Sequence, residues 1–306
     1  METESGARRR RRMQEKGAGG VNSGVEVRFT KLHGLGNDYL YIDARALPEG
    51  DWADLARRMS DRHFGVGADG IILIVSSAVA PVGMRIFNAD GSESEMCGNG
   101  LRGLAKWLYD RGVLGKEQAV ETGAGVLYPT VVAVDQGRAT RIRVDMGPPR
   151  WSRAAIGISA GDPDAPFRDQ AVEVGGENVR ATAVSMGNPH LIVFGPLWDD
   201  ERLARLGPGL ERHPWFPRRI NVHSVAVESW GVIRMRHWER GAGATMACGT
   251  GVAAAVAAAS TGGLTANRVT VHVPGGVLMA EHDTQNGHMF LEGPAVEVCE
   301  GIYAPK

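Results

Sequence analysis

Residues 97–100 read Cys-Gly-Asn-Gly and residues 248–251 read Cys-Gly-Thr-Gly, and a stretch with helical character follows each phrase. This repeat predicts one thiol at the N-terminus of each of two helices. A helix N-terminus presents unpaired backbone N–H groups and favours negative charge, so a cysteine there ionises more readily. Two such thiols facing one substrate suit a reaction that removes a proton on one side and returns a proton on the other.

The composition indicates a soluble globular protein. The chain has 306 residues, of which 43% are hydrophobic and 23% are charged, and its net charge is −1. Nothing in this balance indicates a nucleic-acid or membrane partner, and the length allows one large domain or two of average size. The three cysteines form neither a disulfide framework nor a Cys-x-x-Cys metal motif, so we expect no metal and a cytoplasmic location.

The first 24 residues differ from the rest of the chain. They contain an unbroken arginine run, Arg8 to Arg12, followed by a glycine-rich phrase. No apolar segment follows the arginines, so we expect neither a secretory nor a twin-arginine signal. We predict a disordered basic tail over residues 1–24, or an upstream start site that adds nothing to the fold. A basic arm that contacts nucleic acid is the alternative.

Short alternating stretches dominate the remainder and predict many strands with few helices. Expected helices cover residues 52–60, with Asp51 as N-cap, residues 101–109 and residues 252–259. The last of these is nearly all small and apolar, which is typical of a helix buried on every side. Expected strands cover residues 25–29, 39–42, 70–75, 84–88, 179–185, 191–194, 220–227, 232–238, 269–273 and 277–281.

The order of elements recurs after a boundary at Met146-Gly147-Pro148-Pro149. Each half offers many short strands and one principal helix that begins with Cys-Gly-x-Gly. We therefore predict an α+β fold of two similar domains, each a curled sheet or barrel around a central helix. The predicted domains cover residues 25–146 and residues 147–292.

Five phrases in the same order resemble the diaminopimelate epimerase family. They are Phe-Thr-Lys-Leu-His-Gly-Leu-Gly-Asn-Asp at 29–38, Arg-Ile-Phe-Asn-Ala-Asp-Gly-Ser-Glu at 85–93, Gly-Asn-Pro-His at 187–190, Glu-Arg-Gly-Ala-Gly at 239–243 and Ala-Cys-Gly-Thr-Gly at 247–251. The resemblance runs from Val25 to the C-terminus. It implies cofactor-independent interconversion of LL- and meso-diaminopimelate, in the synthesis of lysine and peptidoglycan precursors. It also implies an active site between the domains, the return of residues 293–306 to the first domain, and a homodimer.

The chemistry needs a base on one face of the α-carbon and an acid on the other. Cys97 and Cys248 fit these roles as thiolate and thiol, and they exchange roles with reaction direction. Their titrations are expected to be coupled, so the pKa values belong to the pair. The backbone N–H groups of the residues that follow the cysteines are expected to hold the α-carboxylate of the substrate. These residues are Gly98, Asn99, Gly249 and Thr250.

The resemblance also assigns the residues that recognise the far end of the substrate. Asn37, Asn88, Asn188 and Asn221 supply amide contacts, and Glu239 and Arg240 supply charge. A guanidinium forks onto a carboxylate, and a carboxylate meets an ammonium group. His190 and Glu239 are expected to tune the cysteine pKa values. None of the five lysines lies in a phosphate-binding pattern with a Schiff-base lysine, so no pyridoxal phosphate site is predicted.

Three positions depart from the family pattern. Gly70 stands where some members carry glutamine, Ala244 where the family usually has glutamate, and Cys299 where some members place a tyrosine used in the dimer contact. Ala244 motivates an alternative, a same-fold epimerase or racemase acting on a different amino acid in a specialised pathway. A non-catalytic binding protein of the same fold is a further alternative. Proline racemases and phenazine-type isomerases share the architecture, but the phrases here match them less well.

Overall fold

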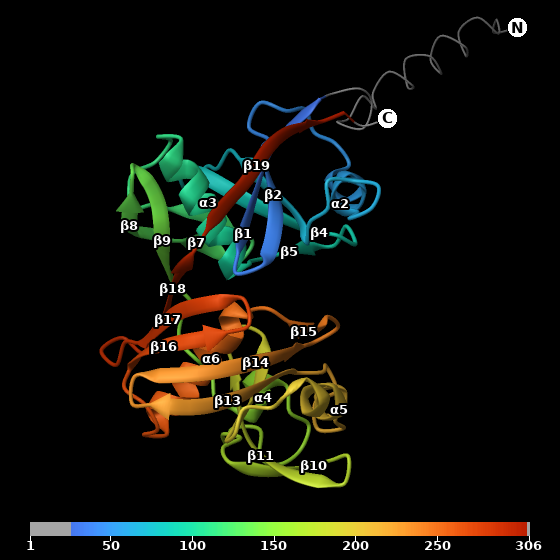
Figure 1. Cartoon of the computed structure of the whole chain (residues 1–306), viewed down its shortest axis with the longest axis vertical. Helices are drawn as coiled ribbons and strands as arrows, with labels where there is room; N and C mark the ends of the chain where they lie inside the picture. The colour runs from blue at the N-terminus through green and yellow to red at the C-terminus, as the bar shows by residue number, and fades with distance from the viewer. Residues whose placement is uncertain (1–25, 305–306) are drawn as a thin grey trace, which may run out of the picture.

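The computed structural model describes residues 26–304, so the predicted tail over residues 1–24 lies outside the described part. The chain forms two lobes, with the N-terminal half in one lobe and most of the C-terminal half in the other (Figure 1). The last strand runs back into the first lobe. Among the described residues, no helix is both long enough and apolar enough to cross a bilayer.

The first lobe is built on an eight-stranded sheet in the order β19-β1-β2-β3-β4-β6-β7, with β5 paired to β4. The final strand of the chain forms one edge and runs antiparallel to β1. The strands are β1 (Val27–Gly34), β2 (Asn37–Asp43), β3 (Gly70–Val75), β4 (Val82–Asn88), β5 (Glu93–Ser94), β6 (Val120–Thr122), β7 (Gly125–Leu127) and β19 (Val296–Tyr303).

The second sheet has eleven strands in the order β10-β11-β12-β13-β14-β16-β17-β18-β9-β8, with β15 paired to β14. Its strands are β8 (Thr130–Asp135), β9 (Arg138–Asp145), β10 (Gln170–Val174), β11 (Glu177–Ser185), β12 (Pro189–Phe194), β13 (Asn221–Ser229), β14 (Val232–Glu239), β15 (Gly243–Thr245), β16 (Arg268–Val273), β17 (Gly276–His282) and β18 (Met289–Pro294). Because β9 pairs with β18, hydrogen bonds join residues before position 147 to the second sheet. The predicted domain boundaries stay predictions.

One long helix lies at the centre of each lobe. Helix α3 (Gly98–Asp110) packs against β1, β2, β8 and β9, and α6 (Gly249–Thr261) packs against β11–β13, β17 and β18. Residues 252–259 of α6 are buried on every side, as the small apolar composition predicts. Cys97 is the N-cap of α3 and Cys248 is the N-cap of α6, so both thiols lie at helix N-termini as predicted.

In residues 26–304, three further helices lie outside these two central ones. Helix α2 (Trp52–Ser60) begins at the predicted N-cap, where Asp51 accepts a hydrogen bond of 2.9 Å from the backbone N–H of Asp54. Helices α4 (Arg153–Ile156) and α5 (Asp200–Glu211) were not expected from the sequence. The remaining predicted strands and helices are confirmed to within three residues at each end, except that β1 ends at Gly34, five residues later than predicted, and residue 25 lies outside the described part.

A single apolar core runs through both lobes. It includes Leu101 and Leu104 of α3, Val252 and Val256 of α6, and Leu291 of β18, all fully buried. Smaller clusters lie beneath α5 and beneath α2. Burial of this apolar surface is the main driving force for folding. Because this core is continuous between the lobes, the N-termini of α3 and α6 are held at fixed positions on either side of one cavity.

Candidate active site

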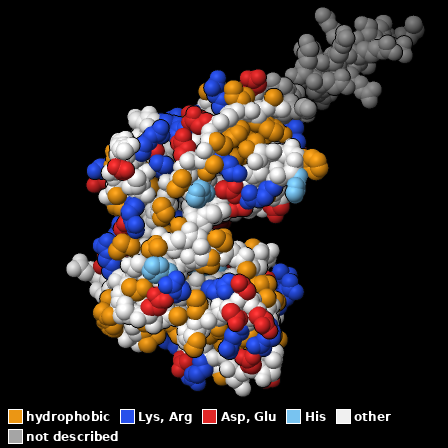
Figure 2. All heavy atoms as spheres, in the orientation of Figure 1, with side chains coloured by type: hydrophobic (Ala, Val, Ile, Leu, Met, Phe, Trp, Pro, Cys, Tyr) orange, Lys and Arg blue, Asp and Glu red, His pale blue; other side chains and the backbone are white. Residues whose placement is uncertain are grey.

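A cavity of about 640 Å³ lies between the two helix N-termini. It opens into the notch that separates the lobes in the space-filling view (Figure 2). The cavity brings together ten of the predicted site residues: Asn37, Cys97, Gly98, Asn99, Asn188, Glu239, Arg240, Cys248, Gly249 and Thr250. Asn88, His190 and Asn221 are not among the lining residues. Residues 93–96, Tyr39 and Met186 line the cavity too, and the sequence did not single them out as site residues.

The thiol of Cys97 donates a hydrogen bond of 3.7 Å to the Oδ1 of Asn37, and two groups donate to its sulfur. The backbone N–H of Gly100 donates to its sulfur at 3.4 Å, and the hydroxyl of Tyr39 donates to the same sulfur at 3.7 Å. The negative charge of a Cys97 thiolate, together with burial, raises the pKa of Tyr39, so the phenol keeps its proton and remains a donor. These donors and the helix N-terminus stabilise a thiolate at this position.

Cys248 lies in the opposite environment. Burial raises the pKa of this thiol well above its ordinary value, and the neighbouring carboxylate of Glu239 raises it further. Hydrogen bonds from the Gly251 backbone and the Thr250 side chain lower the pKa in part. The hydroxyl of Thr245 donates to Glu239 and so fixes the carboxylate beside the thiol. Burial and Glu239 therefore hold Cys248 in its protonated form, whereas the sulfur of Cys97 receives hydrogen bonds at a helix N-terminus.

The two helix starts form a cradle for an anion. Gly98 and Asn99 begin α3, and Gly249 and Thr250 begin α6, so their backbone N–H groups have no acceptor within the helix. A methyl group added to Gly249 would lie 3.8 Å from the Oδ1 of Asn99, so the two helix starts are neighbours. Converging N–H groups at two helix N-termini favour a carboxylate.

A hydrogen-bonded row anchors the first-lobe side of the cradle. Asn37 donates to Asp69 at 2.7 Å and accepts from the amide of Asn99 at 3.2 Å. Arg102, which is fully buried, donates to the Oδ1 of Asn99 at 2.6 Å. Burial lowers the pKa of Arg102 to about 10, so it stays charged at neutral pH. Asp69 and Arg102 are thus positioning residues that the sequence did not single out.

Asn88 and Asn221 lie behind the cavity wall. Asn88 donates to the hydroxyls of Ser92 and Ser94, and Ser94 lines the cavity. Asn221 is buried, accepts from the backbone N–H of Arg240 at 2.9 Å and donates to the Pro189 carbonyl at 3.0 Å. These contacts position the cavity lining, and a direct substrate contact by either asparagine stays a prediction.

His190 lies beneath Asn188 and belongs to a row of three buried histidines. Its Nε2 is 2.9 Å from the Oδ1 of Asn188, and its Nδ1 is 2.9 Å from the Nε2 of His223. The Nδ1 of His223 is in turn 2.9 Å from the Nδ1 of His237. Burial lowers the pKa of His190 and of His237 to about 3, so both imidazoles are neutral at neutral pH. The predicted tuning role of His190 stays a prediction.

His223 and His237 were not predicted as site residues, although the sequence around them carries a signal. His223 follows Asn221 by two residues and His237 precedes Glu239 by two, so strand periodicity places each on the same face as a predicted site residue. His190, His223 and Cys248 also form a possible metal-donor group, with ligand atoms within 4.8 Å of one another. In this arrangement the Nδ1 of His190 and the Nε2 of His223 are hydrogen-bonded to each other.

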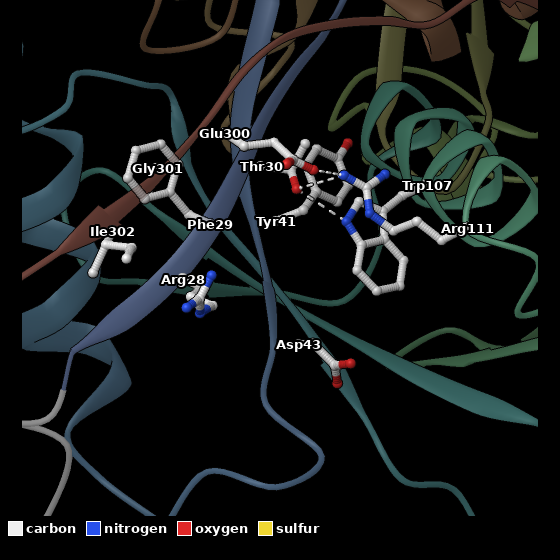
Figure 3. Close-up of a pocket in the computed structure, with 10 residues that line it drawn as sticks. All are labelled: Arg28, Phe29, Thr30, Tyr41, Asp43, Trp107, Arg111, Glu300, Gly301 and Ile302. Carbon is white, nitrogen blue, oxygen red and sulfur yellow. Dashed lines mark hydrogen bonds and ion pairs between the residues drawn. The ribbon is translucent and has the colours of Figure 1, made fainter.

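A second hollow of about 410 Å³ lies on the first lobe (Figure 3). It is lined by β1, β2, β19 and α3. Thr30 accepts hydrogen bonds from Trp107 and Arg111, each at 3.1 Å, and Arg111 pairs with Glu300. None of the predicted site residues lines this hollow. The chemistry therefore belongs to the cavity between the helix N-termini.

Comparison with known proteins identifies the family. The sequence profile described as "Diaminopimelate epimerase" matches residues 29–152 and 182–298. A diaminopimelate epimerase of Pelotomaculum thermopropionicum is 48% identical over 281 residues, covering 90% of this chain and 99% of that protein. One from Moorella thermoacetica is 46% identical over 280 residues, covering 90% and 99%.

The chain belongs to the diaminopimelate epimerase family.

Solved structures with lower sequence identity share the fold. A Bacillus anthracis phenazine biosynthesis protein has a TM-score of 0.68 at 20% identity, covering 91% of this chain and 99% of that chain. A hydroxyproline epimerase from Agrobacterium vitis has a TM-score of 0.63 at 16% identity, covering 91% of both chains. These likenesses, with the two curled sheets, confirm the predicted α+β fold of the diaminopimelate epimerase family.

Two of the three departures from the epimerase pattern, Gly70 and Ala244, have local explanations. A Cβ on Gly70 would lie 2.2 Å from the carbonyl oxygen of Phe87, so β3 and β4 approach too closely here for any side chain. Ala244 is exposed in β15, opposite Trp238. The carboxylate beside Cys248 comes from Glu239 instead, which Thr245 holds. The acidic neighbour of the second thiol is therefore present without a glutamate at position 244.

Proposed function

We propose that this chain is an isomerase that interconverts LL-2,6-diaminopimelate and meso-diaminopimelate, in the synthesis of lysine and peptidoglycan precursors. The observation that carries the proposal is the pair of helix N-cap cysteines on one cavity, in opposite electrostatic environments. Relatives named diaminopimelate epimerase, 42–48% identical over about 90% of the chain, supply the substrate.

The mechanism follows from the surroundings of the two sulfurs. In one direction the Cys97 thiolate removes the α-proton, and the protonated Cys248 donates its proton to the opposite face of the same carbon. Cys97 ends as a thiol and Cys248 as a thiolate, so the reverse reaction begins with the roles exchanged. The N–H groups at both helix starts hold the α-carboxylate and stabilise the charge that develops on it. No cofactor is required for these steps.

The far end of the substrate meets polar side chains at the rim. Arg240 is exposed, lines the cavity and carries a planar guanidinium suited to a carboxylate. Asn188 supplies an amide there, whereas Glu239 lies beside Cys248, so its negative charge suits an ammonium group near the reacting carbon. A substrate with an amine and a carboxylate at both ends therefore finds complementary groups at both ends of the cavity.

A substrate panel tests the proposal. The purified protein, with no added cofactor, should epimerise diaminopimelate faster than any other amino acid offered. Turnover of a different amino acid, with none of diaminopimelate, would support the alternative of a specialised same-fold epimerase or racemase. Binding of diaminopimelate without turnover would support a non-catalytic binding protein. The high identity to named diaminopimelate epimerases does not favour either alternative.

We further propose that the protein is a cytoplasmic homodimer. The three described cysteines are free thiols, in keeping with a reducing compartment. Edge strand β19 exposes Val298 at 55% and Ile302 at 50% of their surface, and an exposed apolar edge favours association. Light scattering should give a dimer mass that falls to the monomer mass in Val298→Lys. A monomeric wild-type protein would contradict this. No nucleic-acid partner is proposed.

A further inference from the structure

Three buried imidazoles continue the cavity wall into the core of the second lobe. The row runs from Asn188, which lines the cavity, through His190 of β12 and His223 of β13 to His237 of β14. Strand register brings them together, because His190 pairs with Asn221 and His223 pairs with His237 across adjacent strands. All three imidazoles are at most 1% exposed. Each contact in the row is 2.9 Å long, the length of a good hydrogen bond.

A row of neutral imidazoles has a direction. Each neutral ring has one N–H donor and one bare acceptor nitrogen. Burial, together with the neighbouring histidines, lowers the pKa of His223 well below its ordinary value, as burial does for the other two. No ring therefore donates from both nitrogens at neutral pH. Once one hydrogen in the row is placed, all the others are fixed.

The far end of the row decides the direction. The Nε2 of His237 is buried and has no hydrogen-bond partner. In one direction the row ends there on a bare nitrogen, and in the other it ends on a buried N–H without an acceptor. Unpaired buried N–H groups are rarer in proteins than unpaired acceptors. The favoured row therefore has His237 donating from Nδ1 to His223, and His223 donating from Nε2 to His190.

We propose that this histidine row orients the side-chain amide of Asn188, so that its NH₂ group faces the cavity and binds a carboxylate of the substrate. With His190 donating from Nε2, the Oδ1 of Asn188 is the acceptor, and the Nδ2 of the amide is left for the cavity. A reversed row would present the carbonyl oxygen instead and would favour an ammonium group. His223 and His237 are thus positioning residues for substrate specificity. The inference rests on the proposed function, because it uses a carboxylate of diaminopimelate.

The helix that carries Cys248 is shaped to admit the row. A Cβ on Gly251 would lie 2.4 Å from the Cε1 and 2.6 Å from the Nε2 of His223. Only glycine at this position leaves room for the imidazole. The imidazole of His223, in the middle of the row, therefore occupies a space between β13 and the first turn of α6 that a glycine at position 251 leaves open.

Nitrogen-15 NMR of the wild-type protein with labelled histidines tests the direction of the row. The measurement does not depend on whether the protein turns over diaminopimelate. At pH 7.5 we expect His190 and His223 to be protonated at Nε2 and His237 at Nδ1. Protonation of His190 at Nδ1, or a doubly protonated ring within the row, would overturn the inference. If the protein epimerises diaminopimelate but shows the opposite tautomers, the proposal for the histidine row is wrong and the proposed function stands. If the protein shows the expected tautomers but does not turn over diaminopimelate, the proposed function is wrong and the direction of the row stands.

Two variants of His237 that have the same shape but differ in hydrogen-bonding capacity test the consequence for substrate binding. His237→Asn keeps a donor near the position of Nδ1, so the KM for LL-diaminopimelate should stay within about threefold of wild type. His237→Asp offers only an acceptor, reverses the row and should raise the KM roughly tenfold to a hundredfold, with a much smaller change in kcat. Equal KM values for the two variants would overturn the inference.

Two further variants guard against general damage. Met235→Leu changes another buried residue of β14, two positions from His237, and should alter neither KM nor kcat. His237→Leu removes the donor without burying a charge, and should give a KM between those of the Asn and Asp variants. If His237→Asp does not fold, His237→Leu decides, and a wild-type KM in this variant would overturn the inference.

Discussion

The hydroxyl of Tyr39 lies 3.7 Å from the sulfur of Cys97 and donates its hydrogen to it. The second sulfur at the cavity, that of Cys248, lies beside the carboxylate of Glu239 instead. A donor stabilises a thiolate, whereas a carboxylate stabilises a thiol. The two sulfurs therefore lie in different electrostatic surroundings, although their sequence phrases are nearly the same.

Tyr39→Phe should lower kcat for diaminopimelate about tenfold and leave the KM nearly unchanged. The substitution keeps the buried ring but removes one donor to a charged sulfur, an interaction that contributes about 1.5 kcal/mol. Steady-state kinetics in both directions measures the effect. Tyr41→Phe is the matched control, since its hydroxyl donates to the Gly100 carbonyl at 2.9 Å. It should lower the free energy of unfolding by about 1 kcal/mol and leave kcat unchanged. Equal losses of kcat in both variants would count against a role for the Tyr39 hydroxyl.

Glu239→Gln should shift the alkaline limb of the kcat–pH profile to lower pH. The carboxylate raises the pKa of Cys248, so a neutral amide lets this thiol ionise at a lower pH. The limb reports the cysteine pair rather than one residue, so the shift should be read as an apparent value. Glu95→Gln is the control, because Glu95 lines the same cavity but does not contribute to the raised pKa of Cys248. An unchanged limb in Glu239→Gln would exclude the assigned electrostatic role.

The histidine row should make the protein sensitive to acid. Burial lowers the pKa of His190 and His237 to about 3 and that of His223 well below 6.5, whereas the unfolded chain binds protons near 6.5. A depressed pKa gives stability that is present above pH 6.5 and is lost as the pH falls toward 3. Each such group contributes a slope of up to about 1.4 kcal/mol per pH unit. Denaturant unfolding at several pH values should show a steep loss of stability below pH 6. In His237→Leu the dependence of the unfolding free energy on pH should be weaker by up to about 1.4 kcal/mol per pH unit, because one fewer proton is bound on unfolding. A slope equal to that of the wild type would argue against a neutral buried His237.

Gly251→Ala should destabilise the protein by about 2 kcal/mol or more, because the added methyl group collides with the imidazole of His223. The same change in a His223→Ala background should cost much less, since the obstructing ring is gone. A double-mutant cycle on the free energy of unfolding measures the coupling between these two neighbours. Additive effects would show that His223 does not occupy the space beside Gly251.

Local patterns predicted much of this fold because they depend on residues close in sequence. The helix starts at Cys97 and Cys248 and the N-cap at Asp51 follow from short phrases. Helix α5 was missed because Gly207, Pro208 and Gly209 lie within it, and it is stabilised by packing against β13 and β14. Tertiary contacts of this kind override local propensity.

The parts of the site that depend on long-range register were not predictable. The contact between Tyr39 and Cys97 joins residues of β2 and the start of α3, and the histidine row needs three strands in one alignment. The pairing of Asp145 with Phe290 joins distant parts of the chain. Single-sequence patterns give the side-chain faces of each strand but not which strands are neighbours.

The direct test of the two-thiol mechanism is the origin of the hydrogen on the product α-carbon. With LL-diaminopimelate in deuterated water, the first meso product should carry deuterium, while unreacted LL substrate keeps its hydrogen, because Cys97 and Cys248 act on opposite faces. Cys97→Ala and Cys248→Ala should each abolish epimerisation. Product that retains the substrate's own hydrogen, or full activity in either variant, would contradict the mechanism.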